Sequence, residues 1–409
     1  MIAVVGSGAA GLMAAIHAAG PGRRVLLIER TADGGRKILI SGGGRCNVLP
    51  GTLDETRFVT ASSANTMKKI LRSWPLRDQR AFFEKTLGLP LVLEEETGKL
   101  FPAANKSRAV RDALTALARD RGVEWVGNTC IVAMQQVEHR WRLIADNGKQ
   151  FDCDAVVMAT GGLSVPATGS DGTGLRILDA LGHTINPLYP ALTPLTLDPP
   201  AFADLAGVSL DVSITASSAT EECRASGGFL FTHRGFSGPS VLDISHVAVR
   251  TRLAGQAAAV LRVQWAHLDA ATWENALTAS AQSVVTVLRQ HLPARLADRL
   301  LAEADVPGST VLAQLQRPAR RRIVDALTRF ALPWTGDEGY KKAEVTGGGV
   351  ALDQVNTQTL ESRHHEGLFL AGELLDAFGP IGGYNFVWAW CTGRLAGLGA
   401  AHSVGTLSS

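Results

Sequence analysis

The chain has 409 residues, 46% of them hydrophobic and 19% charged, which is typical of a globular protein of two or three domains at roughly 150 residues each. The formal net charge of +2 gives no general attraction to nucleic acids or membranes. The cysteines lack CxxC spacing and lie near no histidine cluster, so we expect no disulfide framework and no metal; they are Cys46, Cys130, Cys153, Cys223 and Cys391.

The first thirty residues predict a dinucleotide-binding unit. An apolar run, a glycine-rich turn, a helical pattern and a second apolar run follow one another at residues 2–5, 6–11, 12–19 and 25–28. Gly6 allows a tight turn, Gly8 lets the backbone approach a pyrophosphate, and Gly11 lets the helix pack on the sheet. The helix N-terminus offers N–H groups to phosphates. Glu29, about 20 residues after the glycines, can accept hydrogen bonds from a ribose. This role for Glu29 favours FAD over FMN, which has no adenosine.

The middle of the first half predicts alternating elements. A glycine- and cation-rich segment covers 34–47, and a helical stretch covers 62–87, broken at Pro75. A helix is expected over 107–120 with Ser107 as its N-cap. Two strands are expected within 91–102 around a turn at Thr97-Gly98, and further strands at 123–126, 130–137, 141–145 and 154–159. The glycine turn at 169–174 opens a helix, and we interpret it as a strand-to-helix turn because no acid follows at a strand end.

A cluster of prolines predicts a domain boundary, at positions 187, 190, 194 and 199. The next segment has a different character, with expected strands at 208–214, 228–232 and 258–265 and helices at 271–292, 296–304 and 310–315. Cofactor-like sequence then returns. We therefore predict one nucleotide-binding domain made from both ends of the chain, 1–190 and 333–409, with residues 191–332 inserted.

The C-terminal segment predicts the second half of a flavin site. A strand at 367–371 runs into a glycine turn, followed by Asp376 and a glycine-led helix over 386–399. In such sites the acid meets the ribityl chain or pyrophosphate. The helix N-terminus faces the flavin pyrimidine edge, where negative charge develops on reduction. The alternative is an apolar helix that only completes the fold.

Several long motifs strongly resemble the BaiN/RdsA-type family of NAD(P)/FAD-dependent flavoproteins, which includes members called aminoacetone oxidases. They are GRKILISGGGRCN at 35–47, ATGG at 159–162, FLFTHRGFSGPSVLDIS at 229–245, VTGGGV at 345–350 and LFLAGELLDAFGPIGGYNFVWAW at 368–390. The resemblance implies an α/β fold, a Rossmann-like FAD-binding domain of the two-dinucleotide-binding-domain flavoprotein type. It also implies an inserted domain with a β-barrel and helices. Val48-Leu49-Pro50 replaces a Thr-Asn-type continuation, and residues 191–332 contain no Lys, which indicates a divergent subgroup.

The resemblance implies non-covalent FAD and a set of residues that hold it. Contacts to the ADP half fall on Gly6, Gly8, Ala10, Gly11, Glu29 and Arg30. Contacts along the pyrophosphate and flavin fall on Arg36, Lys37, Ser41, Gly42, Gly43, Cys46 and Asn47. Ile131 would offer its backbone to adenine, and Thr160 with Gly161 would close over the nucleotide. The flavin end would be completed by Gly372, Glu373, Asp376, Gly382, Gly383, Tyr384 and Asn385.

The residues assign no catalytic group firmly. Cys46 is a candidate proton donor or a loop thiol, Tyr384 a positioning or packing residue, and His233 a flavin-facing or loop-fixing histidine. NAD(P)H is expected to bind transiently, because no second complete dinucleotide unit is present.

Three reactions follow as hypotheses. The first is NAD(P)H-driven reduction of a polarised C=C bond in a small molecule, and the second is oxidation of a small amine such as aminoacetone by O2. The third is reduction of a uridine in ribosomal RNA, as in one family branch. An arginine cluster in the insert would then contact phosphates; the alternative is that it forms a solvated helix face. The cluster is Arg317, Arg320, Arg321 and Arg322.

No apolar run approaches about 18 residues and a strand begins at residue 2, so we expect a cytoplasmic protein without a leader.

Overall fold

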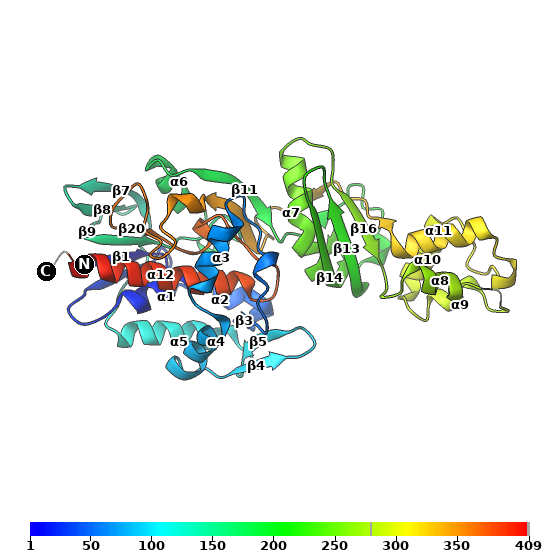
Figure 1. Ribbon diagram of the computed structural model, residues 1–409, viewed down its shortest axis with the longest axis horizontal. Coiled ribbons are helices and arrows are strands. Elements are labelled where there is room, and N and C mark those ends of the chain that lie inside the picture. The colour runs from blue at the N-terminus through cyan, green and yellow to red at the C-terminus, as the bar shows by residue number, and fades with distance from the viewer. Residues whose placement is uncertain (279, 407–409) are drawn as a thin grey trace. The chain divides into compact units, whose positions relative to one another are not determined.

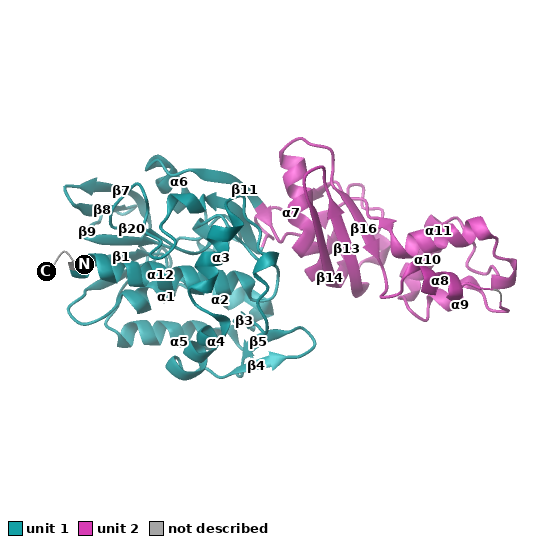
Figure 2. Ribbon diagram, viewed as in Figure 1, with its two compact units in different colours: residues 1–189, 344–409 teal, residues 190–343 magenta. Residues whose placement is uncertain are grey.

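The computed structural model describes residues 1–278 and 280–406 (Figure 1). The chain forms two compact units (Figure 2): unit 1 contains residues 1–189 and the segment from 344 onward, and unit 2 contains residues 190–343. Unit 2 therefore extends beyond residue 332, where the sequence analysis placed its end. The reason is that β18 (Gly336–Asp337) pairs with β12 (Leu195–Thr196) and stays in the sheet of unit 2.

Unit 1 is built on a five-stranded parallel sheet with the order β20-β10-β1-β2-β6. The strands are β1 (Ile2–Val5), β2 (Val25–Ile28), β6 (Glu124–Val126), β10 (Ala155–Met158) and β20 (Leu368–Leu370). All residues of β1, β2, β10 and β20 are buried, which explains their apolar composition. Because β20, β10 and β1 are neighbours and parallel, the turns after their carboxyl ends meet at one edge of the sheet.

Helices α1 (Ala9–Ala18) and α12 (Tyr384–Thr406) come from opposite ends of the chain and pack closely together (Figure 1). A Cβ at Gly393 would lie 2.3 Å from the Ala10 carbonyl oxygen, and a Cβ at Gly397 would lie 2.3 Å from the Ala14 carbonyl oxygen. Glycine spaced four residues apart on α12 thus lets the two backbones touch. This contact brings the N-termini of both helices to the same edge of the sheet.

The remaining elements of unit 1 surround this core. Helices are α2 (Arg36–Ile40), α3 (Ala64–Arg72), α4 (Leu76–Ala81), α5 (Ser107–Asp120) and α6 (Thr173–Ala180). Strands form three small sheets: β3 (Leu49–Pro50), β5 (Lys99–Pro102) and β4 (Leu91–Glu94); β7 (Ile131–Val137), β8 (Arg140–Ala145) and β9 (Gln150–Cys153); and β11 (Ile185–Ala191) with β19 (Val345–Val350).

Local expectations for unit 1 were met with one correction. The stretch 62–87 is interrupted at Pro75, as predicted, because α3 ends before it and α4 begins after it. Ser107 is not the N-cap of α5. Lys106 occupies that position, while the Ser107 hydroxyl donates to the Leu39 carbonyl at 2.7 Å, a long-range partner that cap statistics do not anticipate.

Unit 2 combines an antiparallel sheet with helices. The seven strands have the order β17-β16-β13-β14-β15-β12-β18, and those not yet given are β13 (Ser209–Ser217), β14 (Glu222–Phe231), β15 (Gly235–Ser237), β16 (Val260–Gln264) and β17 (Phe330–Ala331). The helices are α7 (Pro239–Leu253), α8 (Ala270–Ala276), α9 (Val284–Leu288), α10 (Ala294–Glu303) and α11 (Arg317–Thr328). The helix α7 packs on β13 and β14. Phe229, Phe231, Phe236 and Trp265 form an aromatic core.

Two helix predictions in unit 2 were wrong. The expected helix over 271–292 is divided into α8 and α9, because Leu277 ends the first and Ser283 precedes the second as N-cap; residue 279 lies outside the described residues. The segment 310–315 contains only a 3-10 turn at Leu312–Gln314.

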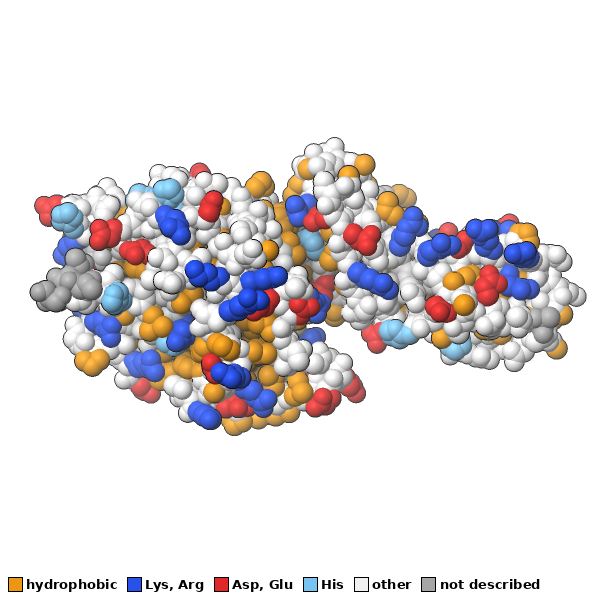
Figure 3. Space-filling model, viewed as in Figure 1, with side chains coloured by type: hydrophobic (Ala, Val, Ile, Leu, Met, Phe, Trp, Pro, Cys, Tyr) orange, Lys and Arg blue, Asp and Glu red, His pale blue; other side chains and the backbone are white. Residues whose placement is uncertain are grey.

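Lys and Arg side chains gather over α10 and α11 (Figure 3). Among the described residues, no helix is long and apolar enough to cross a membrane.

Candidate functional site

A cavity of about 440 Å³ lies in unit 1 beside the carboxyl ends of β1, β10 and β20. Its lining includes most of the predicted cofactor residues: Gly6, Gly8, Ala10, Glu29, Arg30, Arg36, Lys37, Ser41, Gly42, Gly43, Asn47, Ile131, Thr160, Gly161, Gly372, Glu373, Gly382, Gly383 and Asn385. The structure therefore brings together segments separated by more than 300 positions in the sequence. Gly11, Cys46, Asp376 and Tyr384 do not belong to this lining.

The three glycines before and within α1 have different reasons to be glycine. Gly6 has a φ of +97°, and a Cβ there would lie 2.6 Å from the Ala159 carbonyl oxygen; a Cβ at Gly11 would lie 1.8 Å from the Gly6 carbonyl oxygen. Protein packing thus excludes larger residues at both positions. A Cβ at Gly8 would meet no protein atom within 4 Å, although Gly8 lines the cavity. This open approach to the N-terminus of α1 fits a phosphate group.

Glu29 is buried and its carboxylate is already extensively hydrogen-bonded. One oxygen accepts from the backbone N–H and hydroxyl of Ser7 at 2.8 and 2.7 Å. The other accepts from the N–H and hydroxyl of Thr31, both at 2.8 Å. A carboxylate offers about four acceptor positions, so a ribose would share or replace one of these donors. Sequence reasoning located Glu29 but not the residues that orient it.

Arg30 follows Glu29 directly and connects the end of β2 to the later glycine turn. Its guanidinium lies 2.7 Å from an Asp171 carboxylate oxygen and donates to the Gly169 carbonyl at 3.0 Å. Burial opposes ionisation of Asp171, but hydrogen bonds from Arg30 and Thr173 outweigh it and lower its pKa to about 2. The turn at 169–174 lines the same cavity as Glu29 and precedes α6, so it does not create a separate site.

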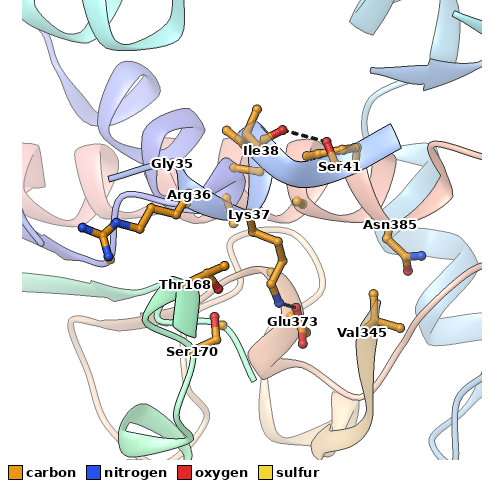
Figure 4. A pocket seen from close by; sticks show the side chains of 18 of the residues that line it. Gly35, Arg36, Lys37, Ile38, Ser41, Thr168, Ser170, Val345, Glu373 and Asn385 are labelled. Carbon is orange, nitrogen blue, oxygen red and sulfur yellow. Dashed lines mark hydrogen bonds and ion pairs between the residues drawn. The ribbon is translucent and has the colours of Figure 1, made fainter. Parts of the chain in front are cut away.

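Lys37 and Glu373 form an ion pair across the middle of the cavity (Figure 4). The Lys37 Nζ lies 2.7 Å from Glu373 Oε2 and donates to the Ser164 hydroxyl, also at 2.7 Å. Glu373 Oε1 accepts from the Ser164 hydroxyl at 2.6 Å and the Thr346 N–H at 2.9 Å. Burial would raise the pKa of Glu373, but Lys37 and these hydrogen bonds hold it below its usual value. The pair fixes α2 to the turn after β20.

The other end of the cavity lies at the N-terminus of α12 and is more apolar. The Asn385 side chain is fixed by donating to the Gly379 carbonyl and accepting from the Gly379 N–H, each at 2.9 Å. Unpredicted lining residues here are Ile40, Phe101, Phe378, Ile381, Phe386 and Trp388. The sequence pattern did not identify them as site residues, because hydrophobic residues in such segments are usually assigned to the core.

Asp376 has a different place from the one predicted. Its side chain is buried and one oxygen accepts hydrogen bonds from Thr60, Ala61, Ser62 and Asn186, at 2.7 to 3.0 Å. The carboxylate therefore holds the loop at 60–62 against the turn before α12. This arrangement positions the flavin end of the cavity indirectly, because Ala377 and Phe378 follow Asp376 directly and line it.

Two of the three catalytic candidates, Cys46 and Tyr384, do not line the cavity. Cys46 is fully buried with a φ of +60°, and burial raises its pKa to about 12. The Tyr384 hydroxyl accepts from the Asp54 N–H at 3.4 Å, and its ring packs near Phe58. His233 is exposed in a turn of unit 2. These observations favour a loop thiol for Cys46 and a packing residue for Tyr384. The flavin-facing role of His233 stays a prediction.

The chemistry of the lining fits FAD. A buried acid and an unobstructed helix N-terminus suit an adenosine ribose and a pyrophosphate, while the aromatic and aliphatic end suits an isoalloxazine ring. Within residues 1–278 and 280–406, no group of three or more His, Cys, Asp or Glu side chains is placed to hold a metal ion.

Comparisons with known proteins agree with this geometry. Residues 1–399 match the family described as HI0933-like protein Rossmann domain. The chain is 33% identical over 397 residues to a ribosomal RNA dihydrouridine synthase of Escherichia coli, covering 95% of this chain and 94% of the relative. It is 30% identical over 416 residues to a 3-dehydro-bile acid delta(4,6)-reductase of Clostridium scindens, covering 98% of each.

Solved structures show the same fold at low sequence identity. A 3-ketosteroid delta1-dehydrogenase from Sterolibacterium denitrificans aligns with a TM-score of 0.53 and 13% identity, covering 98% of this chain and 99% of the other. An open flavocytochrome c3 fumarate reductase aligns with a TM-score of 0.50 and 16% identity, covering 98% and 78%. The chain therefore belongs to the HI0933-like family of BaiN/RdsA-type flavoproteins and is an FAD-dependent oxidoreductase.

Proposed function

We propose that this protein uses NAD(P)H to reduce a C=C bond that is conjugated to a carbonyl group. The names of the two relatives describe acceptors of this kind. Dihydrouridine differs from uridine by saturation of the C5=C6 bond, which is conjugated to a ring carbonyl. In a 3-dehydro acceptor with delta(4,6) unsaturation, the C=C bonds are conjugated to the C3 carbonyl. The shared class of reaction is the observation that carries this proposal.

Bound FAD would supply the redox chemistry, taking two electrons and a proton from NAD(P)H and passing the equivalent of a hydride to the acceptor. The acceptor carbon adjacent to the carbonyl then gains a proton from water, so that the C=C bond becomes CH–CH. The chain's own residues bind and orient. The Lys37–Glu373 pair fixes α2 beside the turn after β20, and Phe378 and Phe386 help to keep the α12 end apolar.

The position of the second glycine turn supports transient binding of NAD(P)H. The second glycine turn, at 169–174, lines the same cavity as Gly8 and Glu29. Donor and acceptor would then occupy the flavin end one after the other. Oxidation of a small amine, such as aminoacetone, receives no comparable support, since both relatives carry the names of enzymes that saturate or reduce their substrates. Hydrogen peroxide release on addition of amines would favour oxidation instead.

The decisive experiment follows the flavin absorbance after anaerobic mixing with NADH or NADPH. We expect rapid bleaching by at least one of them, and recovery of the oxidised spectrum when a conjugated enone is added. A matched saturated ketone is the control, because it has no C=C bond to reduce. Reduction by an amine but by neither nicotinamide would contradict the proposal.

A uridine in ribosomal RNA is a second candidate acceptor, favoured by the 33% identity to the Escherichia coli relative over most of both chains. Of the arginine cluster on α11, Arg320 and Arg322 donate to backbone carbonyls of their own unit. Arg317 and Arg321 are exposed and remain available to phosphates. We expect salt-dependent binding of ribosomal RNA fragments that weakens in an Arg317→Ala/Arg321→Ala variant and persists in Arg77→Ala, an exposed change in unit 1. If ribosomal RNA fragments do not bind even at low salt, ribosomal RNA is excluded as the acceptor.

A further inference from the structure

The cationic side chains that line the cavity differ in whether a carboxylate pairs with them. There are five of them: Arg30, Arg36, Lys37, Arg45 and Lys99. Four have carboxylate partners, which are Asp171, Asp33, Glu373 and Glu94 at 2.7, 3.0, 2.7 and 2.8 Å. Among the described residues, Lys99 has no hydrogen-bond or ion-pair partner of its own. Lys99 is therefore the one cation of this lining that makes no direct ion pair with a described residue, although its charge acts on Glu94 from a distance.

Lys99 is placed at the α12 end of the cavity. It begins β5, and the hairpin of β4 and β5 forms part of the lower edge of unit 1 in Figure 1. A Cβ at Gly382 would lie 3.4 Å from Lys99 Cε, so the lysine stem runs along the glycine turn that precedes α12. Phe101 and Ile381 line the same end. The ammonium is therefore carried on a half-buried stem beside apolar side chains.

The carboxylate that faces Lys99 across the hairpin is already engaged. Glu94 lies opposite Lys99 in the β4–β5 register, but its oxygens accept from the Thr97 hydroxyl at 2.6 Å and from Arg45 at 2.8 Å. The Arg45 guanidinium also lies 4.1 Å above the Phe101 ring. Arg45 is thus held by protein groups on two sides. Lys99 is the cation that remains for a ligand.

We propose that Lys99 is the anion-binding subsite for the acceptor, taking a carboxylate or a phosphate oxygen of the molecule whose C=C bond is reduced. The inference rests on the proposed function of this cavity. The apolar body of the acceptor packs against Ile40, which is 53% exposed, and against Phe101 and Ile381. A cation at this position attracts anionic acceptors and repels an ammonium group. The same residue therefore separates acidic acceptors from small amines.

The first test measures anion binding without turnover. The oxidised holoenzyme is titrated separately with inorganic phosphate and with acetate, and binding is followed by perturbation of the visible flavin spectrum. We expect Lys99→Met to weaken binding about tenfold or more, Lys99→Arg to retain most of it, and Lys149→Met, an exposed change on the β8–β9 turn, to leave it unchanged. The proposal is overturned if Lys99→Met and the unmodified protein bind these anions with equal affinity. It is also overturned if the unmodified protein binds neither anion. Neither result depends on whether NAD(P)H reduces the flavin.

The second test identifies the source of the anion. Acceptors are compared in pairs, uridine with a uridine-containing dinucleotide and a neutral enone with the same enone bearing a carboxylate. We expect Lys99→Met to raise KM about tenfold or more for the anionic member of one pair, with its neutral partner unaffected. The pair that responds distinguishes a phosphate from a carboxylate. If the variant slows both members equally and lowers the flavin midpoint potential, Lys99 acts on the flavin and the proposal is wrong.

Discussion

A Gly8→Ala substitution should separate ligand binding from folding. Gly8 has φ −69° and ψ −171°, values that alanine adopts without strain. The added Cβ would meet no protein atom within 4 Å. The substitution changes an N-cap, which costs up to about 1 kcal/mol. We therefore expect the FAD-free protein to lose less than about 1 kcal/mol of unfolding free energy.

The same methyl group should interfere with FAD. Gly8 lines the cavity at the start of α1, where phosphate oxygens approach backbone N–H groups. A loss of ten- to a hundredfold in affinity corresponds to about 1.4 to 2.8 kcal/mol. At FAD concentrations near 1,000 times the original dissociation constant, FAD-dependent stabilisation would fall from about 4.1 to about 2.7 kcal/mol for a tenfold loss.

Denaturant unfolding with and without added FAD measures both quantities. Gly405→Ala in α12 is a suitable control, because its Cβ would also meet no atom within 4 Å but Gly405 is not part of the cavity lining. Gly11→Ala gives the opposite contrast, since its Cβ would lie 1.8 Å from the Gly6 carbonyl oxygen and should destabilise the FAD-free protein. An unchanged FAD-dependent stabilisation in Gly8→Ala would refute the placement of phosphate at this turn.

Three further predictions concern stability and are measured by urea unfolding. Gly393→Ala should destabilise by about 1–3 kcal/mol, because it forces α12 away from Ala10; a gain from the higher helix propensity of alanine would contradict the close packing. Asp376→Asn should cost about 2–3 kcal/mol, because the loop at 60–62 loses a charged acceptor, and a change below 0.5 kcal/mol, roughly that of a surface substitution, would argue against this role. Burial lowers the pKa of His246 from 6.5 to about 4, so the unfolded state binds the proton more tightly. Stability should then fall as pH drops from 6.5 to 4, by up to about 3 kcal/mol, and a His246→Gln variant that keeps the full slope would exclude this origin.

The N-terminal half of the site could be predicted because its determinants are local. Strand, glycine turn, helix and second strand occur in order within thirty residues, and the parallel pairing of β1 with β2 then places Glu29 next to Gly6 at the sheet edge. The expected interruption at Pro75 likewise depends on the chemistry of one residue. In these segments, the neighbours in sequence are also the neighbours in space.

The errors arise where a side chain's direction depends on distant partners. Asp376 follows the expected strand and turn, yet its carboxylate is taken by donors from 60–62 and by Asn186. Cys46 lies within a glycine-rich motif, but its backbone conformation and burial place it outside the cavity lining. Lys99 enters the cavity through a hairpin that pairs with β3, and nothing within the hairpin sequence indicates that pairing.

The close packing of α1 and α12 explains why the two halves of the chain form one site. A phosphate at α1 and a flavin ring at α12 can belong to the same molecule only if both helix N-termini face one cavity. Gly393 and Gly397 allow that approach, because they let the α12 backbone touch Ala10 and Ala14. The Lys37–Glu373 pair joins the two halves inside the cavity. Because these contacts connect segments more than 300 positions apart, binding one FAD molecule and packing the C-terminal helix should stabilise each other. Through this coupling, Gly393 and Gly397 should affect FAD affinity indirectly, although neither lines the cavity.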